Sequence, residues 1–348
     1  MSSKNNFNIT LDKFIDLALY DKDIGYYMKR DPFGKDGDFI TAPNLSRLFS
    51  EMIAVWIIGF WENLGSPKKF NLVELGAGNG SMMKILIETF KKFPRFFNSC
   101  NIIIHEKSPK LIKIQKKELI QKKVIWLSDI KKIKTFPTIF IANEFFDSIA
   151  IKQFVKIDNL WFEKYVNIQN KEKPFFLNKI IDMKKFEKKI GYDISKNQNF
   201  IEYSFLGVKY LEKIANTIKK NNGGLLIIDY GYFEKKMKNT LKAISNHKYT
   251  DILKNIGESD ITHNINFFLF RKITNQLGGL KNIITTQRNF LIKMGIEKRA
   301  EIISKNQNFS KKADIYYRLK KLIDENQMGK IFKVMFIKKQ KNNYNLGF

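Results

Sequence analysis

The sequence predicts an α/β protein whose core is a doubly wound, mostly parallel sheet. From residue 70 onward, short apolar runs typical of buried strands alternate with amphipathic stretches typical of helices. The run at 72–75 leads into a loop with three alternate glycines, Gly76, Gly78 and Gly80, and a helix-like stretch follows. Five of the apolar runs end in an acidic or amide residue, which would place polar side chains along one edge of the sheet.

The core elements can be assigned in chain order from these patterns. After the second strand and Glu106, Ser108 has the character of a helix N-cap and Pro109 that of a first-turn residue. Each later strand is likewise a short apolar run bounded by polar or glycine residues. The expected strands are 72–75, 101–105, 124–127, 138–142, 225–228 and 332–338.

Three additions to this core are expected. Residues 1–62 form an N-terminal helical extension with a covering loop, because apolar residues from Leu45 to Phe60 recur on one helical face. Residues 151–199 alternate apolar and polar side chains and predict an antiparallel meander insertion. Residues 236–325 are expected to form a mostly helical cap. The core then comprises residues 63–150, 200–235 and 326–340.

The composition of the 348-residue chain limits its function. Of its 62 basic residues 55 are lysine, scattered in pairs, so the net charge of +28 indicates compositional drift and argues against a nucleic-acid partner. One cysteine, Cys100, and three histidines predict no disulfide and no metal site. The longest apolar run, 52–61, is too short for membrane insertion, and no signal or transit pattern precedes it. We therefore expect a cytoplasmic protein.

The glycine loop is the strongest functional signal. Glycine adopts backbone dihedrals that other residues avoid and lets a ligand lie against the main chain. The pattern is E-x-G-x-G-x-G, beginning at Glu74, and it differs from the G-x-G-x-x-G of dinucleotide sites. It resembles the first motif of class I methyltransferases, in which the acidic residue lies near the methionine end of S-adenosyl-L-methionine. An ordinary strand-to-helix turn is the alternative.

The polar residues at the strand ends are the candidate ligands of this cofactor. Glu106 suits the ribose, because one carboxylate can accept hydrogen bonds from both hydroxyls. Asp129 suits the adenine amine, and Asn143 completes the cofactor-binding set with Glu74 and the three loop glycines. Glu106 could instead serve only as a partner of the Ser108 helix turn.

Glu144 and Asp147 are the candidate catalytic residues. They follow the strand that lies next to the first strand in this fold, where a methyl acceptor meets the sulfonium. An arginine guanidinium has a pKa above about 12, so a carboxylate is needed to orient it and stabilise its charge. The alternative is that the two carboxylates only cap the next helix.

Motifs along nearly the whole chain resemble the MidA family of methyltransferases, whose mitochondrial members act in respiratory complex I assembly. Two departures are that the loop carries Ala77-Gly78-Asn79 and that Asn266 stands where relatives have aspartate. The matching segments are 18–21, 25–27, Gly34, 37–43, Ser46, 49–51, 74–80, 106–109, 143–147, 229–232, 260–263, 266–267, 286–291, 328–329 and 332–335.

The resemblance implies methylation of a protein arginine, with symmetric dimethylation attributed to the mitochondrial members. It also implies that the segment containing Gly37, Phe39 and Thr41 lies over the cofactor and closes the site. An RNA or small-molecule methyltransferase on the same fold remains an alternative, because a fold does not determine its substrate. A non-catalytic assembly factor is a second alternative, and the sequence leaves the target protein, the methylation pattern and the oligomeric state open.

Overall fold

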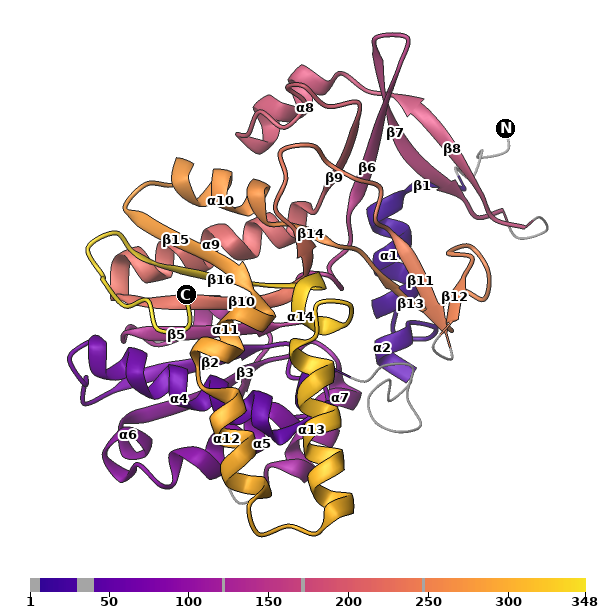
Figure 1. The fold of residues 1–348 in the computed structure, drawn as a ribbon. Coiled ribbons are helices and arrows are strands. Elements are labelled where there is room, and N and C mark those ends of the chain that lie inside the picture. Colours follow the sequence, from indigo (N-terminus) through magenta and orange to yellow (C-terminus); the bar gives the residue numbers. More distant parts are fainter. Residues whose placement is uncertain (1–6, 30–40, 121–122, 170–172, 246–247) are drawn as a thin grey trace.

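The computed structural model describes residues 7–29, 41–120, 123–169, 173–245 and 248–348, with a central sheet beside two smaller ones (Figure 1). Within these residues the central sheet has the order β15-β16-β10-β5-β2-β3-β4, and β14 pairs with β10. Strand β16 runs antiparallel to both its neighbours, and the other pairs along this path are parallel. The strands are β2 (Phe70–Leu75), β3 (Cys100–His105), β4 (Val124–Leu127), β5 (Thr138–Asn143), β10 (Gly223–Tyr232), β14 (Ile265–Asn266), β15 (Leu280–Thr286) and β16 (Phe332–Lys339).

Helices cover both faces of the central sheet. On one face, α4 (Arg47–Asn63) and α5 (Ser81–Phe90) pack with α11 to α13 into one apolar cluster. On the other face, α9 (Phe205–Asn221) and α10 (Phe267–Gln276) belong to a second cluster. Because both faces are covered, strands β2 and β5 are buried along their whole length, as continuous apolar runs in a parallel sheet require. The remaining helices are α3 (Ala42–Leu45), α6 (Pro94–Ser99), α7 (Pro109–Glu118), η1 (Ile130–Lys132), α11 (Gln287–Lys293), α12 (Ile296–Ser304), α13 (Phe309–Ile323) and α14 (Met328–Ile331).

The segment expected to form a meander contains three antiparallel strands, β6 (Lys152–Ile157), β7 (Leu160–Asn167) and β8 (Phe175–Ile180), followed by α8 (Met183–Ile190). Two strands from outside that segment complete this sheet, β1 (Asn8–Thr10) on β7 and β9 (Phe200–Tyr203) on β6. The boundary drawn at residue 200 therefore assigned β9 to the core, whereas β9 pairs with the peripheral sheet.

The segment expected to form a helical cap is more varied than predicted. It contains a small antiparallel sheet of β11 (Lys242–Ser245), β12 (Lys248–Thr250) and β13 (Asp260–Thr262). It also contains β15, which pairs with β16 over its full length and is an edge strand of the core. Strand β15 therefore belongs to the core and not to the cap. The sequence pattern does not indicate this, because its pairing partner β16 lies some fifty residues further along the chain.

Helix α1 (Leu11–Tyr20) joins the N-terminal extension to the small sheet. Its buried residues, with Tyr26 of α2 (Tyr26–Lys29), pack in a third apolar cluster that includes Ile151, Ala243 and Ile261. This packing holds α1, α2 and β13 beside the carboxyl ends of the central strands (Figure 1).

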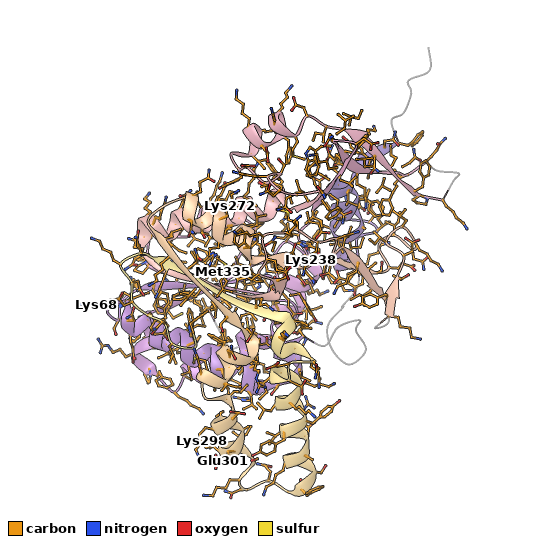
Figure 2. The ribbon with its side chains drawn as sticks, turned by 45° about the horizontal axis from the view of Figure 1, so that its top comes forward. Lys68, Lys238, Lys272, Lys298, Glu301 and Met335 are labelled. Carbon is orange, nitrogen blue, oxygen red and sulfur yellow. The ribbon has the colours of Figure 1, made fainter. Side chains whose placement is uncertain are left out.

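Charged side chains spread over the outside of the molecule. Figure 2 shows Lys68, Lys272 and Lys298 projecting from widely separated parts of the surface, whereas Met335 lies inside, fully buried in β16. Among the described residues, no helix is long and apolar enough to cross a membrane.

Candidate active site

The loop after β2 has a backbone that only glycine adopts without strain. Gly76, Gly78 and Gly80 all have positive φ angles, of 65°, 53° and 86°. A Cβ on Gly76 would lie 2.9 Å from the ring of Phe145, and so would clash with it. The loop therefore provides a flat backbone surface that ends where α5 begins.

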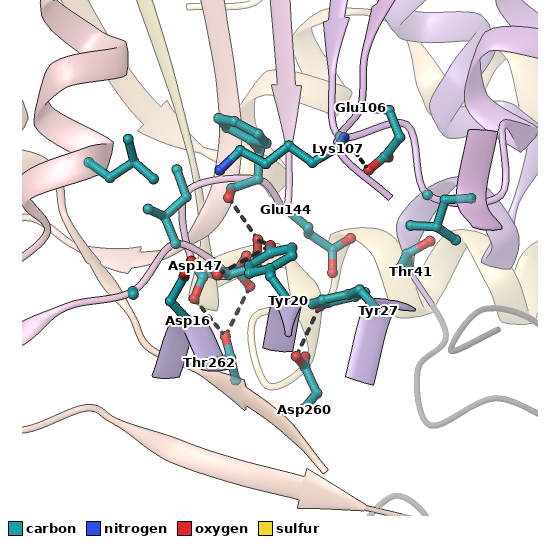
Figure 3. Close-up of a pocket in the computed structure, with 18 of the residues that line it drawn as sticks. Asp16, Tyr20, Tyr27, Thr41, Glu106, Lys107, Glu144, Asp147, Asp260 and Thr262 are labelled. Carbon is teal, nitrogen blue, oxygen red and sulfur yellow. Dashed lines mark hydrogen bonds between the residues drawn. The ribbon is translucent and has the colours of Figure 1, made fainter. Parts of the chain in front are cut away.

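A pocket of about 1090 Å³, including its open mouth, lies between this loop and α1 (Figure 3). Strand ends contribute His105 with Glu106 and the turn after β5, and the peripheral elements contribute Tyr20, Tyr27 and Asp260. The pocket lies beyond the carboxyl ends of the parallel strands, where ligands of doubly wound sheets bind.

Glu106 borders this pocket and is held by three donors. Its Oε1 accepts the N–H groups of Lys107 and Ser108 at 2.8 and 2.9 Å, and its Oε2 accepts the amide of Gln115 at 3.1 Å. Burial raises the pKa of the carboxyl, and these hydrogen bonds lower it. Glu106 thus fixes the turn before α7 and also lines the pocket, and its binding of the ribose stays a prediction.

His105 supports the wall of the pocket beside Glu106. Its Nδ1 is 2.9 Å from the carbonyl of Leu127, which can only accept, so Nδ1 carries the proton. Its Nε2 then accepts from the Tyr210 hydroxyl at 2.9 Å. Burial lowers the pKa of His105, which keeps the ring neutral and this arrangement fixed.

A second cavity, of about 380 Å³, lies on the other side of the glycine loop and shares Gly76, Gly78, Thr41 and Glu144 with the first. Glu74 and Asn143 line it. Within the described residues, Glu74 Oε2 and Asn143 Oδ1 are buried without a hydrogen-bond partner. Buried acceptors without donors are rare and unfavourable, so they fit a ligand that brings N–H groups. Burial, and then Glu106, raise the pKa of Glu74 to about 8.

Glu144 begins the turn after β5 in an unusual backbone conformation. Its φ is 49°, which for a residue with a side chain costs about 1–3 kcal/mol, and its N–H donates to the Ile228 carbonyl at 2.9 Å. Its Oε1 accepts from Asn143 Nδ2 at 3.2 Å. Burial and the nearby Asp147 raise the pKa of Glu144 to about 8. The strained turn thus directs the Glu144 carboxylate into the pocket, where a positively charged group would stabilise its ionised form.

Asp147 lies one turn further and is fixed from two sides. Its carboxylate accepts the Thr262 hydroxyl at 3.1 Å, and its own N–H donates to Asp229 Oδ2 at 3.3 Å. Asp229 also accepts the Phe146 N–H at 3.0 Å, so this fully buried residue organises the turn. Burial raises the pKa of Asp147, whereas His263, Thr262 and Lys242 lower it.

Other predicted residues have different positions. Asp129 is partly exposed and accepts the Lys131 N–H at 2.9 Å, which caps η1, and it does not line the pocket. Gly80 caps α5 and packs against Gln115 instead of lining either cavity. Thr41 borders both cavities, whereas Gly37 and Phe39 lie outside the described residues.

The peripheral side of the pocket was not assigned from the sequence. The rings of Tyr20 and Tyr27 stack with centroids 5.5 Å apart, and the Tyr27 hydroxyl donates to Asp260 Oδ1 at 2.9 Å (Figure 3). Lys242 of β11 lies over Tyr230, 5.2 Å from the ring centroid. Family motifs contain Tyr20, Tyr27 and Asp260, which was the one available signal, but no spacing rule connects them.

The charge of the pocket opposes that of the protein. Its lining residues include five carboxylates and two lysines, whereas the chain has 34 acidic and 62 basic residues. The carboxylates are those of Asp16, Glu106, Glu144, Asp147 and Asp260, and the lysines are Lys107 and Lys242. A cationic ligand is therefore favoured.

The parallel sheet with one antiparallel strand, the glycine loop and the acidic strand ends together define a class I S-adenosylmethionine-dependent methyltransferase. Residues 52–286 match a family described as "Putative S-adenosyl-L-methionine-dependent methyltransferase", and the chain belongs to that family. The MidA resemblance is confirmed, and the protein is an enzyme with S-adenosyl-L-methionine as cofactor. The unpaired acceptors on Glu74 and Asn143 suit the cofactor's amino group, and Glu106 suits its ribose.

Three similarities illustrate this relationship. The chain is 30% identical to protein arginine methyltransferase NDUFAF7, mitochondrial, from Xenopus tropicalis, covering 95% of this chain and 82% of that protein. It is 27% identical to the protein of the same name from Homo sapiens, over 94% of this chain and 80% of that protein. A crystal structure from Burkholderia thailandensis, bound to S-adenosyl-homocysteine, has the same fold, with a TM-score of 0.81, 21% identity and coverage of 98% and 90%.

Proposed function

We propose that this enzyme transfers a methyl group from S-adenosyl-L-methionine to the guanidinium of a protein arginine. The observation that carries the proposal is the group of carboxylates, Glu144, Asp147 and Asp260, in a pocket with aromatic walls. A guanidinium presents five N–H donors in a plane and stays charged, so it matches facing carboxylates better than other methyl-accepting groups do. The names of the relatives, protein arginine methyltransferase, support the same acceptor.

In this mechanism the bound cofactor supplies an electrophilic methyl group, and the chain's own residues position the acceptor. Glu144 accepts hydrogen bonds from the guanidinium, whose positive charge lowers the pKa of this carboxyl and offsets the effects of burial and of Asp147. Tyr20 and Tyr27 cover the acceptor and limit access of water. The nitrogen that gains the methyl group loses one proton, and a carboxylate of this group receives it.

For the protein acceptor, the family resemblance suggests a subunit of respiratory complex I or its bacterial counterpart. The test is to incubate the purified enzyme with methyl-labelled cofactor and an extract from cells that lack it. We expect label in a protein, and mass spectrometry should assign the added mass to arginine. Label found only in RNA or in small molecules would overturn the proposal, as would protein label on a residue other than arginine.

A further inference from the structure

The pocket continues into a groove on the surface. A cavity of about 1060 Å³, including open solvent, lies between α1 and the first residues of α9. It shares Asp16, Tyr20, Ala150 and Leu206 with the pocket. The groove and the pocket therefore adjoin at these four residues.

One stripe of α1 forms a wall of this groove, with side chains four residues apart. Asp12 is paired with Lys152, whose Nζ is 2.9 Å from its carboxylate, and Tyr20 lies beside Ser148. Asp16, between them, is exposed and has no hydrogen bond or ion pair within the described part of the chain. Its carboxylate is therefore available to a ligand at the junction of groove and pocket.

The surroundings of Asp16 favour a cation. Figure 3 shows Asp16 on the same side of the pocket as Asp147. The two lysines of the groove, Lys13 and Lys22, do not border the pocket, and Asp16 is the one charged side chain among the described residues that lines both cavities. Leu17 and Leu206 give the groove apolar walls against which a polypeptide can pack.

We propose that the acceptor polypeptide lies in the groove between α1 and α9, and that Asp16 binds a basic side chain close to the target arginine. This inference rests on the proposed arginine methyltransferase function. Asp16 is then a specificity-determining residue, because it selects the sequence around the arginine and does not contact the reacting atoms. An exposed carboxylate of an ordinary solvated helix would have no such selectivity.

The test measures arginine methylation in an extract of cells lacking the enzyme, at limiting and at saturating extract concentrations. Asp16→Asn should lower the rate at limiting extract about two- to fivefold, and Asp16→Lys about tenfold or more. Both rates should recover at saturating extract, because only acceptor binding is weakened. Asp23 is exposed and lines neither cavity, so Asp23→Asn and Asp23→Lys are matched controls that should behave as wild type.

The affinity for S-adenosylhomocysteine, measured by calorimetry, should be unchanged in all four variants. The inference is overturned if Asp16 variants methylate as fast as wild type at limiting extract, or if the rate stays low at saturation. It is also overturned if the Asp23 variants lose as much activity as the Asp16 variants. Failure of the wild-type enzyme to label any arginine would overturn the proposed function instead, before the variants are compared.

Discussion

Replacing Glu144 with glutamine tests the acceptor site most directly. Glutamine keeps the shape of the side chain and an oxygen that can accept the 3.2 Å hydrogen bond from Asn143, but it removes the negative charge. Loss of the charge-assisted hydrogen bond between Glu144 and the acceptor guanidinium, at a reacting centre, costs about 2.7–4 kcal/mol, or roughly a hundred- to a thousandfold in kcat. The fold should not suffer, because the change also removes repulsion among Glu144, Asp147 and Asp229.

The assay is single-turnover transfer of labelled methyl to extract protein, with calorimetry on S-adenosylhomocysteine and a thermal melt of each variant. We expect the rate to fall by that factor, with the Kd for S-adenosylhomocysteine within about threefold of wild type and no decrease in Tm. Glu62→Gln, on an exposed position of α4, is the matched control. The reasoning is refuted if Glu144→Gln transfers methyl within threefold of the wild-type rate, or if it loses cofactor affinity to the same extent as activity.

Three further outcomes are expected. Glu106→Ala should raise the Kd for S-adenosylhomocysteine about ten- to a hundredfold in calorimetry, because charge-assisted hydrogen bonds contribute about 1.5–3 kcal/mol. An unchanged Kd would exclude binding of the ribose by Glu106. Gly76→Ala should lower the free energy of unfolding, measured by urea denaturation, by about 1–3 kcal/mol, because the φ of 65° and the contact with Phe145 both exclude a Cβ. A variant as stable as the wild type would contradict this expectation. Because the pKa values of Glu74 and Glu144 are raised to about 8 and the ionised forms bind ligands, kcat/KM should rise with pH up to about 8. The folded state favours the protonated forms of both groups, so the Tm of the unliganded enzyme should fall as the pH rises from about 5 to about 8. A kcat/KM and a Tm that do not change with pH would refute both expectations.

The core of the fold could be predicted from the sequence because its signals are local. The strand expected at 124–127 has those bounds in the structure, and Ser108 caps α7 by accepting the Leu111 N–H, as its position before Pro109 indicates. Strand β15 could not be predicted, since its residues form a strand only through pairing with β16.

The same distinction holds for the site. Glu106 and Glu144 follow apolar runs, so the topology of the sheet predicts that they lie at one edge. Asp16, Tyr20 and Asp260 come from α1 and β13, and their proximity depends on apolar packing between segments more than two hundred residues apart. Asp129 follows a strand as well, but its carboxylate caps η1, a local contact that sequence spacing does not distinguish from ligand binding.

The buried carboxylate of Asp229 anchors the turn that carries Glu144 and Asp147 to the central sheet, whereas the groove is bounded largely by α1. Transfer chemistry and choice of acceptor are therefore built on different parts of the chain, which meet where Asp16 and Tyr20 of α1 line the pocket. Substitutions at groove positions outside the pocket, such as Lys13 and Leu17, would change the choice of acceptor and leave the carboxylates of the turn in place.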